Sequence, residues 1–163
     1  MRPVAAVLLL LLTACAGASA EPEAPDTAAG FPVTIDHTGG CMMMGPNCVR
    51  YVAEEDGTVT AYRLGLQEPE ILGMATIDQT LVADLSAAIA ATDLDDLRSR
   101  LDRGQCMGCV DGIDTEVTFT VDDVPVSFSS IDVEFDPSEP VFAALVAIVN
   151  AAQDGIEVPL LAR

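Results

Sequence analysis

The sequence predicts an α+β domain, an antiparallel sheet of two hairpins with two main helices packed on one of its faces. Three observations lead to this prediction. Two β-rich segments each contain an acidic turn between alternating runs, and each is followed by a stretch with helical apolar spacing. The segment that holds them, residues 31–158, has the length of one small domain.

The first part of the sheet is expected to contain a strand and a hairpin. Apolar and polar residues alternate over residues 31–36 (FPVTID), which predicts a strand. Residues 48–64 (CVRYVAEEDGTVTAYRL) contain two β-rich runs separated by Glu55-Asp56-Gly57. Asp-Gly between two alternating runs is a strong hairpin signal.

The second hairpin is expected at residues 113–131. Strict alternation continues through IDTEVTFTV, and the chain then turns at Asp122-Asp123 into VPVSFSSI. Between the two hairpins, residues 69–77 (PEILGMATI) predict another short strand.

The first main helix follows the short strand. Asp78 is expected as the N-cap of a helix that continues to about Ala91. Its apolar stripe consists of Leu81, Leu85 and Ile89, with Val82 and Ala88 beside it. Residues 93–101 (DLDDLRSRL) predict a second, short helix, because acidic residues come early and arginines late, which suits the helix dipole.

The last helix follows the second hairpin. Ser138 is expected as its cap, a proline occupies the first turn, and Gly155 ends it. The apolar stripe consists of Phe142, Leu145, Ile148 and Val149.

Composition excludes several classes of partner. The formal net charge is -19 and every basic side chain is arginine, so nucleic acid and anionic lipid headgroups would be repelled. Aromatic residues make up only 4% of the chain and tryptophan is absent, which argues against an aromatic platform for sugars or bases.

The N-terminus has the layout of an export signal. Arg2 precedes an apolar run from Val4 to Leu12, and small residues follow. The run is too short to span a bilayer as a permanent helix. We expect residues 1–14 to be removed as a signal peptide, and residues 15–30, rich in alanine, proline and acids, to form a flexible tether.

The segment Leu12-Thr13-Ala14-Cys15 resembles the lipobox of bacterial lipoproteins. The resemblance implies that the thiol of Cys15 carries lipid and becomes the mature N-terminus. It places the protein on the outer side of the cytoplasmic membrane or on the outer membrane, anchored by several acyl chains such as palmitate. The alternative is an ordinary secretory signal cleaved after Ala18 or Ala20, which would discard Cys15.

A second resemblance concerns the start of the domain. Cys41, Gly45, Pro46, Cys48 and the run EDGTV are similar to a family of small, uncharacterised bacterial envelope domains. In that family a first strand leads through a cysteine-rich turn into a strand that ends in Asp-Gly-Thr-Val. The resemblance implies a fold and no activity.

Four cysteines remain beside Cys15, and an even count in an exported chain indicates two disulfides. We favour the local pairs Cys41–Cys48 and Cys106–Cys109 over crosslinks between the two loops, which stay open as an alternative. Cys106-Met107-Gly108-Cys109 is also a C-x-x-C motif. It precedes an acidic, strand-like run instead of a helix, which disfavours a reactive thiol.

The alternative use of the sulfur atoms is a copper site, because thiolates and thioethers bind Cu(I). Its candidate ligands are Met42, Met43, Met44, Met107, Cys41, Cys48, Cys106 and Cys109, with His37 nearby. His37 is the only histidine, expected at the surface or at a strand end, and no hydrolase or nucleotide-binding motif is present, so no catalytic residue is assigned. The sequence thus predicts a non-enzymatic binding or structural domain without a cofactor, whose protein or small-molecule partner it does not identify.

Overall fold

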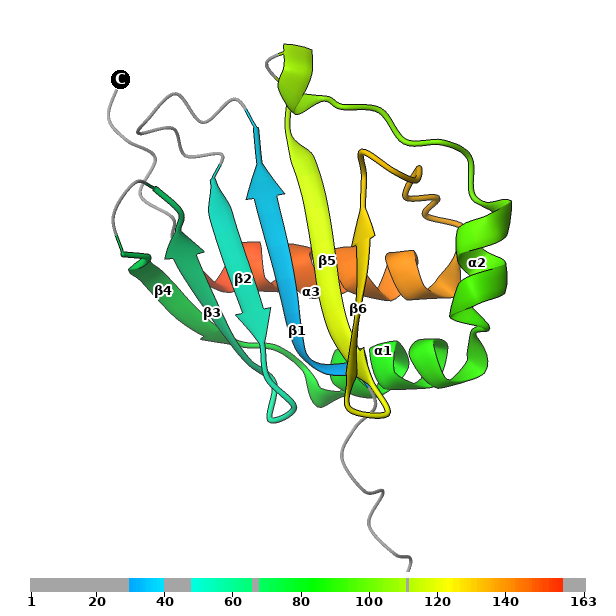
Figure 1. Cartoon of the computed structure of the whole chain (residues 1–163). Helices are drawn as coiled ribbons and strands as arrows, with labels where there is room; N and C mark the ends of the chain where they lie inside the picture. Colours follow the sequence, from blue (N-terminus) through cyan, green and yellow to red (C-terminus); the bar gives the residue numbers. More distant parts are fainter. Residues whose placement is uncertain (1–29, 40–47, 66–67, 111, 157–163) are drawn as a thin grey trace, which may run out of the picture.

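A computed structural model of the chain describes residues 30–39, 48–65, 68–110 and 112–156. In this part of the chain six strands form one antiparallel sheet, and the helices α1 and α3 cross the same face of it (Figure 1). The predicted α+β class is confirmed. The signal segment, Cys15 and the residues from Cys41 to Met44 lie outside the described residues.

The six strands follow the predicted order along the chain. They are β1 (Gly30–Thr38), β2 (Val49–Ala53), β3 (Thr58–Arg63), β4 (Glu70–Thr76), β5 (Asp114–Val121) and β6 (Val124–Ser129). Their order in the sheet is β4-β3-β2-β1-β5-β6, so β1 lies between the two hairpins and joins them. The helices are α1 (Gln79–Ala91), α2 (Leu94–Arg100) and α3 (Pro140–Gly155), and a short 3-10 turn, η1, covers Gly108–Val110.

Both predicted hairpin turns are confirmed. In the β2–β3 turn, Asp56 accepts a hydrogen bond from the Thr58 amide (2.8 Å), and Gly57 adopts a φ of 82°, which glycine tolerates best. In the β5–β6 turn, Asp122 and Asp123 both have positive φ angles, 49° and 62°. Two consecutive left-handed residues match the right-handed twist of a two-residue hairpin, and aspartate is among the few residues that adopt this conformation readily.

The cap of α1 was predicted correctly. Asp78 is its N-cap and accepts a hydrogen bond from the Thr80 amide at 2.9 Å. The predicted stripe faces the sheet, where Val82, Leu85 and Ile89 are buried and Leu81 and Ala88 pack at the margin of the core.

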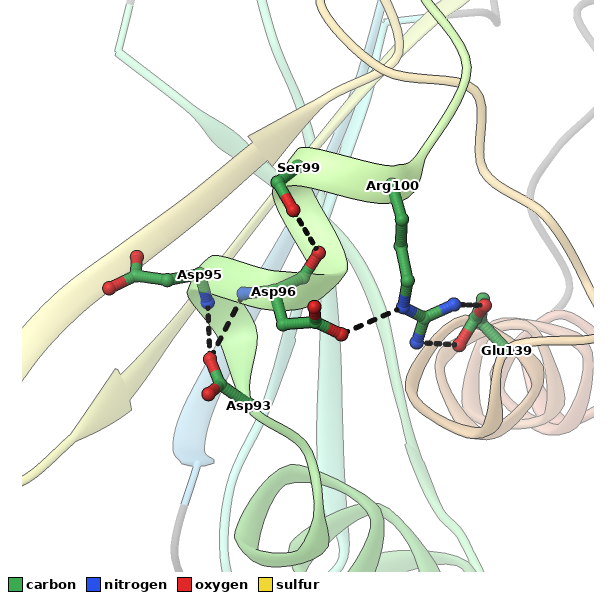
Figure 2. A network of polar contacts seen from close by, with 6 residues as sticks. All are labelled: Asp93, Asp95, Asp96, Ser99, Arg100 and Glu139. Carbon is green, nitrogen blue, oxygen red and sulfur yellow. Dashed lines mark hydrogen bonds and ion pairs between the residues drawn. The ribbon is translucent and has the colours of Figure 1, made fainter.

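The short helix α2 is tied to the start of α3. Asp93 caps α2 by accepting the amides of Asp95 and Asp96, and Figure 2 shows Arg100 between Asp96 and Glu139. The Arg100 Nη2 to Glu139 Oε2 distance is 2.7 Å.

The predicted cap of α3 at Ser138 is wrong. Glu139 is the N-cap residue and makes no capping hydrogen bond with its side chain, which pairs with Arg100 instead. Ser138 lies one residue too early, because its amide donates to Asp136 Oδ1 (2.8 Å) in the turn before the helix. Pro140 in the first turn has no amide hydrogen, so one of the usual N-terminal donors is absent there.

The core lies between the sheet and the two long helices. Phe128 of β6 stands edge-on to Phe142 of α3, with ring centroids 5.6 Å apart, and Phe119 of β5 stacks beside Phe128 at 6.2 Å. All three rings are buried. On the opposite face of the sheet, Asp36 and Arg50 form a bidentate ion pair with both N–O distances at 2.6 Å. No helix among the described residues is long and apolar enough to cross a membrane.

Candidate functional site

Several of the residues singled out by the sequence gather at one end of the sheet, where β1 ends and β5 begins (Figure 1). His37 lies opposite Thr115, and Thr38 lies opposite Asp114. Gly39 then packs on the turn that contains Cys106 and Cys109. A Cβ atom added to Gly39 would lie 2.8 Å from the Gly108 Cα atom, so glycine is needed for this close approach.

Cys106 and Cys109 form a disulfide, with their Cα atoms 5.4 Å apart. This is one of the two local pairs that we favoured from the sequence. Cys48 is also disulfide-bonded, and its partner lies outside the described residues. Cys41 lies outside the described residues, so the pair Cys41–Cys48 stays a prediction.

The disulfide turn is held by Asp114, a residue that sequence reasoning missed. Asp114 is only 6% exposed, and no other charged residue in the described part of the chain is buried. Its carboxylate accepts the amides of Met107 (2.7 Å) and Gly108 (3.0 Å), and Cys106 Sγ lies 3.8 Å from its Oδ2 atom. An acid that follows a C-x-x-C turn by a few residues was visible in the sequence, but its burial was not.

The described residues offer little to a metal ion. No group of three or more histidine, cysteine or acidic side chains among them lies close enough together to bind one. Both cysteines of the C-x-x-C motif are oxidised, so neither supplies a thiolate. Met42, Met43 and Met44 lie outside the described residues, and Met107 is 44% exposed on the disulfide turn.

A cavity of about 310 Å³ opens between α3 and the strands β1 and β5; we name it the α3 cavity. Its apolar walls come from both layers and include Ile35, Val117, Phe142, Leu145, Val146 and Val149. Its polar lining consists of His37, Thr115, Asn150 and Gln153, none of which carries a full negative charge. The cavity was not predicted, because it requires the sheet and the helix to be placed against each other.

His37 is the titratable group in this lining. It is half-buried near the end of β1, and its ring stands edge-on to Tyr51 at a centroid distance of 5.8 Å. Burial lowers the pKa of His37 below its ordinary value of 6.5, and the charge of Asp36 opposes part of this effect. The imidazole is therefore neutral at neutral pH and offers one donor and one acceptor.

The hydrogen bonds around the cavity continue into the core. The Tyr51 hydroxyl accepts a hydrogen bond from Gln153 Nε2 at 3.3 Å, which links β2 to the last turns of α3. Tyr51 itself is buried. The lining of the α3 cavity thus combines apolar walls with neutral hydrogen-bonding groups.

Neither a known protein family nor any curated protein matches the sequence of this chain. The functional conclusion therefore depends on the geometry and chemistry of the site.

Proposed function

We propose that the protein is a membrane-anchored envelope lipoprotein whose α+β domain binds a small, largely apolar ligand in the α3 cavity. The observation that carries the binding role is the cavity itself. Its volume of about 310 Å³ lies at the lower end of the range for small-molecule sites. Such sites combine mostly apolar walls with a few polar groups that orient the ligand.

The composition of the lining suggests the chemistry of the ligand. Val146 is 51% exposed at the margin of the cavity, although the larger apolar side chains Phe142, Leu145 and Ile148 of α3 are buried. Covering apolar surface of this kind is favourable, at roughly 25 cal/mol per Å². The neutral side chains of His37, Asn150 and Gln153 would hydrogen-bond a polar group on the ligand.

The anchoring role is supported by the N-terminal signal and by the lipobox resemblance at Cys15. The tether that follows could reach roughly 50 Å if fully extended, which would keep the domain close to the membrane. A domain in this position could collect an apolar ligand close to the bilayer.

The anchor is tested by metabolic labelling with an alkyne analogue of palmitate in a bacterial host. We expect the wild-type chain to be labelled and Cys15→Ser to remain unlabelled. An unlabelled wild-type chain would remove the anchor from the proposal.

The ligand site is tested with Nile red, a neutral apolar dye whose emission shifts when it leaves water. We expect one dye per chain, and Val146→Glu should weaken binding by at least about tenfold, which corresponds to about 1.4 kcal/mol. The matched control is Val124→Glu, because Val124 is similarly exposed (59%) but lies at the β5–β6 turn. If both variants bind the dye like the wild type, the α3 cavity is not the site.

A further inference from the structure

A second cavity of about 350 Å³ lies beside the disulfide turn; we name it the turn cavity. Its lining includes Arg103, Gln105, Met107, Ile113, Val133 and Glu134. Met107 and Ile113 are 44% and 43% exposed, so this cavity also presents apolar side chains to water.

The wall of the turn cavity is formed by two paired backbone segments. The Gln105 amide donates to the Ser130 carbonyl (3.1 Å), and the Glu134 amide donates to the Asp102 carbonyl (2.8 Å). Gly104 lies so close to Ser130 that an added Cβ would overlap the Ser130 carbonyl oxygen. Because these backbone groups are paired with each other, the two segments form a continuous wall that can serve as a preformed surface.

The two cavities are neighbours, because Thr115 and Phe135 line both of them. Phe135 is half-buried and stacks on Phe142 of α3 with a centroid distance of 4.7 Å. Its ring therefore forms an apolar step between the α3 cavity and the turn cavity. A ligand that passes over this step would contact apolar side chains on both sides.

The charges of the two cavities differ. The described lining of the α3 cavity contains no acid and no arginine, whereas the turn cavity contains Arg103 and Glu134. Asp102 and Asp132, both exposed, stand next to the lining residues Arg103 and Val133 in the chain, so acids outnumber the single arginine in these two segments. With a net charge of -19 over the whole chain, a negative head group would be repelled at this end.

We propose that the α3 cavity and the turn cavity form one groove for an elongated amphiphile with a cationic head group. The apolar chain lies in the α3 cavity and crosses Phe135, and the head group lies in the turn cavity near Glu134. This inference rests on the proposed function and specifies the class of ligand.

The test uses the mature chain with Cys15→Ser, and dodecyltrimethylammonium, hexyltrimethylammonium and dodecanoate as probes below their micelle concentrations. Isothermal titration calorimetry should show that dodecyltrimethylammonium binds at least about tenfold more tightly than each of the other two. Comparable binding of the two chain lengths would overturn the groove, and comparable binding of dodecanoate would overturn the cationic preference.

Variants of the turn cavity separate the inference from the proposed function. Met107→Ser should weaken both ammonium probes, because their shared head group lies in the turn cavity, and should leave Nile red in the α3 cavity unchanged. Glu134→Gln should reduce the preference for the cation, whereas Asp84→Asn, at an exposed position of α1, should not. Circular dichroism checks that each variant is folded.

Two outcomes distinguish the failures. If Val146→Glu abolishes binding of both ammonium probes while Met107→Ser and Glu134→Gln have no effect, the extended groove is refuted and the α3 cavity stands. If neither the ammonium probes nor Nile red bind, the proposed function fails and the groove fails with it.

Discussion

Replacing Asp114 by asparagine should destabilise the domain more than any other single change of charge in the described chain. The carboxylate is 6% exposed and accepts two backbone amides, from Met107 at 2.7 Å and from Gly108 at 3.0 Å. Asparagine has one acceptor oxygen, so one amide keeps its partner and the other faces an NH₂ group. A hydrogen bond to a charged group contributes about 1.5 to 3 kcal/mol, and a buried unpaired donor costs a similar amount.

We therefore expect Asp114→Asn to lower the free energy of unfolding by about 2 to 3 kcal/mol. The assay is urea denaturation of the oxidised protein, followed by circular dichroism. The matched control is Asp84→Asn, which should change stability by less than about 0.5 kcal/mol because its side chain is exposed.

The same substitution should loosen the disulfide turn, because Asp114 holds the amides of the two residues between Cys106 and Cys109. Reduction of this disulfide by dithiothreitol should therefore be faster in Asp114→Asn than in the wild type. If Asp114→Asn unfolds at the same urea concentration as Asp84→Asn, the carboxylate does not hold the turn and this reasoning is wrong.

Four further predictions follow from the described contacts. Burial lowers the pKa of His37 below 6.5, so as the pH drops the unfolded chain takes up a proton at His37 before the folded chain does. The free energy of unfolding should therefore fall as the pH drops below about 6.5. Urea midpoints between pH 5 and 8 should show this slope in the wild type and lose it in His37→Gln. Backbone hydrogen bonds from Thr80 and Ser138 lower the pKa values of Asp78 and Asp136. Both carboxylates should therefore stabilise the fold above pH 3.8 and lose this contribution as the pH falls below it. The acid unfolding midpoint of Asp78→Asn, compared with that of the wild type, measures the effect for Asp78. Phe128→Ala should cost about 3 to 5 kcal/mol, seen as a lower Tm, because a buried ring that contacts two others is removed. Gly104→Ala should cost about 1 to 3 kcal/mol and increase hydrogen exchange at the Gln105 amide, because the new methyl group separates the two paired segments.

Local chemistry explains which parts of the fold were predictable. Asp56-Gly57 and Asp122-Asp123 supply the backbone conformations that tight turns need, so both hairpins could be placed from neighbouring residues alone. Asp78 likewise caps α1 through a bond to a residue two positions away. These signals work because the interacting groups are close in sequence.

The prediction of Ser138 as the cap of α3 was wrong because the groups that interact there are far apart in the sequence. Ser138 has the right residue type, but Asp136 engages its amide, and Glu139 starts the helix while its side chain pairs with Arg100, 39 positions away. A local rule could not anticipate a partner on another helix.

The sequence by itself determined the class of the domain and the approximate positions of the six strands and of the helices α1, α2 and α3, whereas the lipid at Cys15 stays a prediction. These depend on residue spacing and on side chains that act on adjacent backbone. Only the tertiary structure decided that β1 joins the two hairpins, that Asp114 is buried beneath the disulfide turn, and that cavities open on both sides of Phe135. Burial and cavities arise where segments distant in the chain pack together, and the spacing of residues along one segment carries no information about that packing.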